Sequence, residues 1–153
     1  MTRRAWLVRP NVRGRSRVDR WLAEGECAIG WREVGPVEPG TPRAVLRARL
    51  AAAYPGRSAA SIAAWVGNLD RFINRMRVGD LVATPAGPCI HVGVVASAVR
   101  WRPHHDEAHH RAVVWDRADA PLERAELSDR ALGKLFTVLT VTDVTDVLEE
   151  LAG

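Results

Sequence analysis

The chain has 153 residues, a net charge of +4 and an apolar fraction of 47%. This length and composition are typical of one globular domain and exclude a disordered chain. No apolar run approaches the roughly 20 residues that span a bilayer, and the N-terminus lacks the apolar stretch of a signal peptide. We therefore expect a single domain over residues 1–153 that is cytoplasmic, has no membrane contact and keeps both cysteines reduced.

The first part of the chain predicts short strands separated by polar loops. Residues 32–42 form a loop, because they contain three prolines and two glycines. Before this loop, the pattern predicts a strand at 5–8, an arginine-rich loop at 10–17, a helical turn at 18–24 and a strand at 27–31.

Two helices follow. The first covers residues 43–54 and ends at Pro55-Gly56. The second, at 58–77, has apolar residues at three- and four-residue spacing, and Ser58 or Ser61 can cap it.

The last part of the chain returns to strands and short helices. We expect strands at 81–84, 90–98 and 111–116, a loop at 101–110, a helix at 127–135, an extended run at 136–141 and a helix at 143–151. Together these elements predict an α+β fold with a small, curved, mostly antiparallel sheet or open barrel and flanking helices.

The positive charge is uneven along the chain. Seven arginines precede Glu24 against the single acid Asp19, whereas the tail is net acidic, and Lys134 is the one lysine. Arginine suits phosphate because of its planar fork, although a GC-rich genome could also explain the lack of lysine. The candidate phosphate-binding residues are Arg9, Arg13, Arg15, Arg17, Arg102, His105 and Arg111.

Six tryptophans are many for this length. Trp65 lies on the apolar stripe of its helix, and Trp6 and Trp115 adjoin apolar strand residues, so we expect all three in the core. Trp31 and Trp101 instead sit at strand ends beside arginines, which is typical of a pocket that stacks on a base. The predicted base-binding cage consists of Trp31, Trp101, Asn11 and Trp21.

The sequence offers little for catalysis. Lys134 has no carboxylate partner in a nuclease-like motif, and neither a phosphate-binding loop nor a nucleophile elbow occurs. Four histidines and two acids fall within residues 104–110, but neighbouring loop residues rarely converge on one ion. We expect no enzyme activity, no metal and no cofactor.

Several segments in order resemble a known family: AWLVRPN, WLAEGECAIGW, MRVGDLVAT, IHVGVVASAV, HHRAVVW and FTVLTV. They are similar to the PUA-like N-terminal domain of Mrr-type modification-dependent restriction nucleases, and to the wider EVE and YTH group. The resemblance implies an aromatic cage for a modified base that is flipped out of double-stranded DNA, with a nuclease domain fused or acting as a partner. The segment SAVRWRP departs from the family, which is often tyrosine-rich there, so the cage composition can differ.

Three alternatives stay open. The chain could be an RNA-binding module of the PUA or ASCH type, because phosphate contacts serve both nucleic acids. It could be a small enzyme or metal protein that uses the histidine loop. It could also be an interaction module in which every tryptophan is buried.

Overall fold

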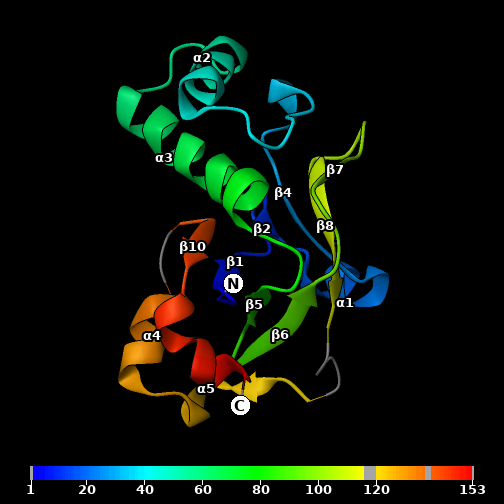
Figure 1. Cartoon of the computed structure of the whole chain (residues 1–153), viewed down its shortest axis with the longest axis vertical. Coiled ribbons are helices and arrows are strands. Elements are labelled where there is room, and N and C mark those ends of the chain that lie inside the picture. Colours follow the sequence, from blue (N-terminus) through cyan, green and yellow to red (C-terminus); the bar gives the residue numbers. More distant parts are fainter. Residues whose placement is uncertain (1, 116–119, 137–138, 153) are drawn as a thin grey trace.

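The computed structural model describes residues 2–115, 120–136 and 139–152. Most strands within these ranges form one curved, open sheet, which lies between two groups of helices (Figure 1). Every strand pair in it is antiparallel except β1–β5, which is parallel. The main path runs β10 (Val141–Asp143), β1 (Ala5–Val8), β5 (Leu81–Ala86), β6 (Cys89–Val95), β8 (His109–Val114) and β4 (Glu26–Ile29).

Shorter strands complete the sheet and form one separate hairpin. β7 (Arg100–Trp101) pairs with β8, and β9 (Leu122–Glu123) pairs with β6. β2 (Asn11–Val12) and β3 (Arg15–Ser16) form their own hairpin, whose turn residues Arg13 and Gly14 both have positive φ. The expected α+β fold with a curved, mostly antiparallel sheet is confirmed.

The helices pack at the two ends of the sheet. In Figure 1, α2 (Arg43–Ala53) and α3 (Ala59–Asp70) lie at the upper left of the molecule, and α4 (Asp129–Leu135) and α5 (Leu148–Ala152) lie at the lower left. Each end has its own apolar cluster. The remaining helical elements are α1 (Val18–Glu24), the π-helix η2 (Arg71–Arg75) and the 3-10 turns η1 (Arg32–Val34), η3 (Arg124–Glu126) and η4 (Thr145–Val147).

The structure refines several sequence expectations. The long helix begins as predicted, because the Ser58 side chain accepts a hydrogen bond from the amide of Ser61, but it changes to a π-helix at Arg71. The loop expected at 101–110 instead contains part of β7 and the start of β8. The run expected at 136–141 includes residues 137 and 138, which lie outside the described residues, as does residue 116 of the predicted strand at 111–116. The last predicted helix begins later, after β10 and η4.

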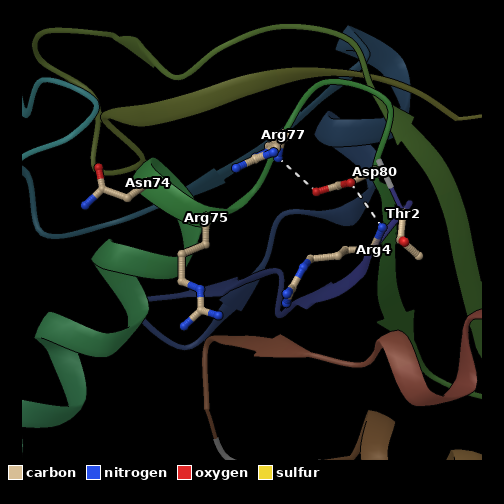
Figure 2. A pocket seen from close by; sticks show the side chains of 6 residues that line it. All are labelled: Thr2, Arg4, Asn74, Arg75, Arg77 and Asp80. Carbon is tan, nitrogen blue, oxygen red and sulfur yellow. Dashed lines mark hydrogen bonds between the residues drawn. The ribbon is translucent and has the colours of Figure 1, made fainter.

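A buried aspartate joins the start of β1 to the turn that precedes β5. Asp80 accepts hydrogen bonds from the backbone amides of Arg4 (3.1 Å) and Arg77 (2.9 Å) and from the Trp6 indole (2.9 Å), and Figure 2 draws both of the amide contacts. These donors use both carboxylate oxygens, as a buried carboxylate requires. Asp80 therefore fixes two arginine backbones relative to each other.

β6 and β8 approach closely at Gly93. A Cβ atom there would come within 2.6 Å of Val113 Cγ1 and 2.7 Å of the Val114 carbonyl oxygen. Only glycine allows this approach, which places β8 across the sheet and so positions the inward-facing side chains described below.

Candidate functional site

An aromatic pocket opens where three distant segments meet. Trp31 comes from the segment before η1, Tyr54 from the end of α2 and Trp65 from α3. The ring centroid of Trp65 lies 6.2 Å from that of Trp31 and 5.2 Å from that of Tyr54, with the Tyr54 ring edge-on. The hollow measures about 290 Å³ and is completed by Val12, Arg13, Gly30, Arg32, Glu33, Arg57 and Asp106.

Trp31 has an unusual backbone conformation. Its φ of 57° lies in the left-handed region, which costs a bulky residue about 1–3 kcal/mol. The ring packs against the apolar core. Such strain persists only where the surroundings hold it, and it is frequent at ligand-binding sites.

Trp65 is not the fully buried core residue that the helical pattern predicts. Its side chain is half-buried and lies on the pocket, at the edge of the apolar stripe that contains Ile62, Val66 and Leu69. Trp6 and Trp115, in contrast, are buried in the core as expected.

Charged groups surround the aromatic rings. The Tyr54 hydroxyl donates a hydrogen bond to Glu33, which lowers the pKa of Glu33; burial and the same bond raise the pKa of Tyr54. The Arg57 guanidinium lies 5.7 Å from the centroid of the Trp65 ring. Arg13, from the turn of the β2–β3 hairpin, pairs with Asp106 at 3.5 Å. The rim therefore combines arginines with two carboxylates.

The other residues of the predicted cage lie elsewhere. Trp101 does not face Trp31: it lines a separate hollow of about 110 Å³ and packs edge-on against His109, with ring centroids 5.1 Å apart. Trp21 is completely buried in the core, so its place in a cage is wrong. Asn11 is exposed on β2 and does not line the aromatic pocket.

His109 separates the two predicted cage tryptophans. Burial lowers the pKa of this imidazole to about 4, although the Trp31 backbone opposes the shift. The ring is therefore neutral near pH 7, and its buried Nε2 has no hydrogen-bond partner among the described residues. The His109 imidazole therefore lies near the backbone of Trp31 and packs against the ring of Trp101.

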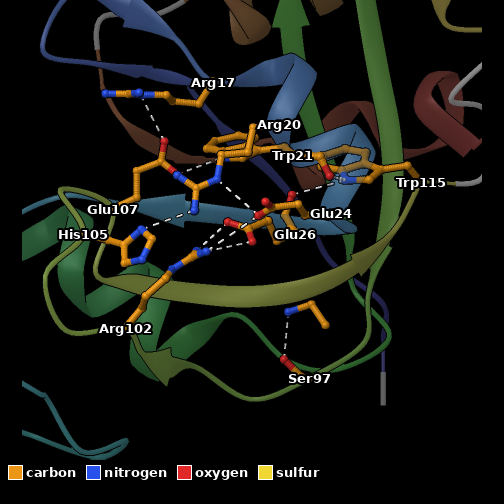
Figure 3. A network of polar contacts seen from close by, with 11 residues as sticks. Arg17, Arg20, Trp21, Glu24, Glu26, Ser97, Arg102, His105, Glu107 and Trp115 are labelled. Carbon is orange, nitrogen blue, oxygen red and sulfur yellow. Dashed lines mark hydrogen bonds and ion pairs between the residues drawn. The ribbon is translucent and has the colours of Figure 1, made fainter.

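Several predicted phosphate-binding groups are held by internal acids instead. Figure 3 shows them packed between α1 and the segment after β7. Arg17 lies 3.3 Å from the buried carboxylate of Glu107, which also accepts a hydrogen bond from the Trp21 indole. Arg102 forms a two-pronged pair with the buried Glu26, with one contact at 3.0 Å.

His105 belongs to the same network. Its Nδ1 lies 3.3 Å from a guanidinium nitrogen of Arg20, which also pairs with Glu24 at 3.2 Å. Three of the residues predicted to bind phosphate, Arg17, Arg102 and His105, therefore contact one internal network.

Arg111 is not a phosphate-binding residue. Its side chain is only 3% exposed and donates hydrogen bonds to the carbonyls of Phe72, Ile73, Met76 and Ser97, at 2.9–3.3 Å. Three of these carbonyls lie at the C-terminal end of η2, where a cation offsets the helix dipole. Burial lowers the pKa of Arg111, but arginine stays charged.

The remaining arginines of the predicted set lie on the first strands. Arg15 is exposed on β3. Arg9 is half-buried after β1, and its amide donates to the Thr140 carbonyl. Of the seven predicted phosphate-binding residues, only Arg13 lines the aromatic pocket.

Five further residues that line the pocket were not predicted from sequence patterns: Tyr54, Arg57, Glu33, Asp106 and Arg32. Tyr54 and Arg57 flank Pro55-Gly56, where the first helix ends. An aromatic residue at the end of a helix was the sequence feature that could have indicated a binding residue here. The contact between this corner and Trp31 depends on tertiary packing.

Other features bear on the alternatives. Cys27 and Cys89 are unpaired as expected, and burial raises the pKa of Cys27 to about 12. Within the described ranges, no three histidine, cysteine or acidic side chains are grouped to hold a metal ion. The part of the chain that the structure describes also contains no helix of sufficient length and apolarity to span a bilayer.

Comparison with known proteins gives a family assignment. A search of curated proteins finds no match to the chain. A family model, described as a domain of unknown function (DUF8426), matches residues 6–145 and so covers all three segments of the aromatic pocket. The chain therefore belongs to the DUF8426 family.

Proposed function

We propose that this chain is a non-catalytic, PUA-like nucleic-acid-binding domain whose pocket of Trp31, Tyr54 and Trp65 receives a modified DNA base. The observation that carries the proposal is the meeting of three aromatic side chains from separate segments around one hollow. Aromatic faces stack on bases, at about 1–3 kcal/mol per base. The mouth of the pocket also carries arginines, which suits a ligand that joins a flat ring to phosphate.

The proposed ligand reaches the pocket by flipping out of the duplex. A stacked base cannot be enclosed by tryptophans, and extruding it costs a few kcal/mol. Stacking on the pocket offsets part of this cost, and phosphate contacts by Arg13, Arg32 and Arg57 supply more. A methylated base is more polarisable and less hydrated than its parent, so an aromatic pocket favours it.

The biological setting follows from the resemblance to the PUA-like domains of modification-dependent restriction nucleases. In that setting the chain supplies recognition, and a fused or partner nuclease domain supplies cleavage. The curved open sheet supports this reading of the fold.

The test is the affinity for DNA duplexes that differ in one base, either unmodified, 5-methylcytosine or N6-methyladenine, measured by fluorescence anisotropy. We expect the native chain to prefer one modified duplex. The variant Trp31→Ala should bind the preferred modified duplex about 5- to 150-fold more weakly than the native chain, which corresponds to the loss of one stacking contact. Denaturation curves establish that each variant is folded.

Trp101→Ala is the matched control, because Trp101 lines a different hollow on the other side of His109. It retains the preference for the modified base. A folded Trp31→Ala protein with unchanged affinity and preference contradicts the proposal. Tighter, Trp31-dependent binding of single-stranded RNA assigns the chain to the RNA-binding alternative.

A further inference from the structure

A second arginine-lined surface lies away from the aromatic pocket. A hollow of about 430 Å³ is lined by Arg4, Arg75, Arg77 and Asp80 among others. Figure 2 shows these side chains. Two further hollows, of about 320 and 380 Å³, adjoin it through Arg75 and Arg4 and meet at Asp143. We call these three hollows together the arginine groove. Among the residues that the structure describes, it shares no lining residue with the aromatic pocket.

The groove arginines project from fixed backbone. Asp80 holds the amides of Arg4 and Arg77, and Arg75 is the last residue of η2. Figure 2 shows the side chains of Arg4 and Arg75 extending toward the same space. Because the backbone is anchored, ligand binding has only the side chains to order, which lowers its entropic cost.

Among the described residues, four arginines and the three aspartates Asp80, Asp143 and Asp146 line the groove, so its formal charge is positive. Arg75 and Arg77 are exposed, and the charges of Arg43 and Arg75 add to the effect of burial in lowering the pKa of Arg71. The Asp80 carboxylate is buried, and its oxygens are taken up by N–H donors. Asp143 pairs with Arg4 at 2.8 Å and accepts from Thr145, so its charge is also largely compensated.

We infer that the arginine groove binds the phosphate backbone of a nucleic acid at a site separate from the aromatic pocket. Guanidinium groups match phosphate geometry, and adjoining hollows suit successive phosphates better than one small anion. Trp65 and Arg75 are ten residues apart on one continuous helical segment, which is about 15 Å along its axis. That separation equals about four base-pair steps of duplex DNA, so one nucleic acid could contact both sites. The inference extends the proposed function but does not depend on it.

The experiment measures how salt affects binding of an unmodified 12-base-pair duplex to the double variant Arg75→Gln/Arg77→Gln. We expect about tenfold weaker binding at low salt, and a slope of log affinity against log salt that is shallower by about two. The matched control is Arg47→Gln/Arg130→Gln, which removes the same charge from exposed positions on α2 and α4. The control keeps the native slope.

Two results overturn the inference. One is equal slopes for the two double variants. The other is that inorganic phosphate or pyrophosphate binds tightly and this binding requires Arg75 and Arg77, whereas duplex binding does not. That result would assign the groove to a small anion. The preference for a modified base is measured separately, as a ratio of two affinities. If the aromatic pocket does not bind a base, the salt slope still tests the groove. If the groove does not bind phosphate, the ratio of affinities still tests the pocket.

Discussion

Beneath α1 and along the inner face of β8, arginines contact buried acids and backbone carbonyls, whereas along the arginine groove they line open hollows. Arg102 and Arg111 exemplify the first region, with Glu26 and the end of η2 as their partners. Arg75 and Arg77 exemplify the second, because both are exposed. The two regions contain the same residue type in opposite settings: in the first, buried arginines stabilise the fold, and in the second, arginine side chains are exposed at open hollows. Local density of arginine in the sequence does not separate these settings, whereas the burial of each side chain does.

Substitution of Arg111 should give the largest change in stability and so tests this comparison most directly. Arg111→Met should lower the free energy of unfolding by about 3–5 kcal/mol, because it leaves several buried carbonyls without donors. Arg75→Met, in the groove, should change it by less than about 0.5 kcal/mol. Urea denaturation of both variants measures the difference. Equal stabilities would remove the distinction between the two regions.

The next effect concerns His109, which faces the same interior as Arg111. In the unfolded chain the imidazole protonates near pH 6.5, but in the folded chain it stays neutral down to about pH 4. The unfolded state therefore binds more protons in this window, so stability falls as the pH drops from 6.5 to 4, by about 3 kcal/mol. His91 and His110, whose pKa values burial also lowers, add to the slope.

Denaturation at a series of pH values tests this effect. His109→Gln should remove the greater part of the slope, whereas His104→Gln, at an exposed loop residue, should retain it. An unchanged slope in His109→Gln would show that other groups cause the acid sensitivity.

Local patterns in the sequence predicted the elements well where the pattern and the packing agree. Residues 5–8 form β1 as expected, and the helix predicted at 43–54 matches α2 to within one residue. Of the two serines expected to cap α3, Ser58 is the one that does so. These features depend on neighbours within a few positions, which is the information that a single sequence contains.

The candidate site was less predictable, because tertiary contacts build it. Trp31 was identified from its polar neighbours, but its ring partners, Tyr54 and Trp65, come from two helices whose packing no local pattern reveals. Arg111 was misassigned although a signal existed: it alternates with His109 and Val113 on the inward face of β8. A strict period-two reading from residue 109 would have placed its side chain inside.

The smallest expected effect comes from substituting Asp143, an acidic residue that lines the groove. Asp143 pairs with Arg4 between two partly exposed side chains, and such pairs contribute at most about 1 kcal/mol. Burial alone would raise the pKa of Asp143, but hydrogen bonds from Thr145 and the charges of Arg4 and Arg75 outweigh it and hold this pKa below its usual value. The carboxylate is therefore ionised at neutral pH, where it competes with any phosphate for Arg4.

Asp143→Asn removes that competition while its amide oxygen can still accept from Thr145. We expect a change in unfolding free energy of less than about 1 kcal/mol, together with tighter binding of the unmodified duplex and a salt slope steeper by up to about one. The anisotropy titration used for the arginine variants measures both quantities, and Asp129→Asn, which removes the same charge at the start of α4, is the control. Because neutralising an acid anywhere makes the chain more positive, only an increase beyond that of the control supports the groove. Weaker binding by Asp143→Asn, or an increase that merely equals the control, would mean that phosphate does not contact Arg4 and that the groove ends at Arg75 and Arg77.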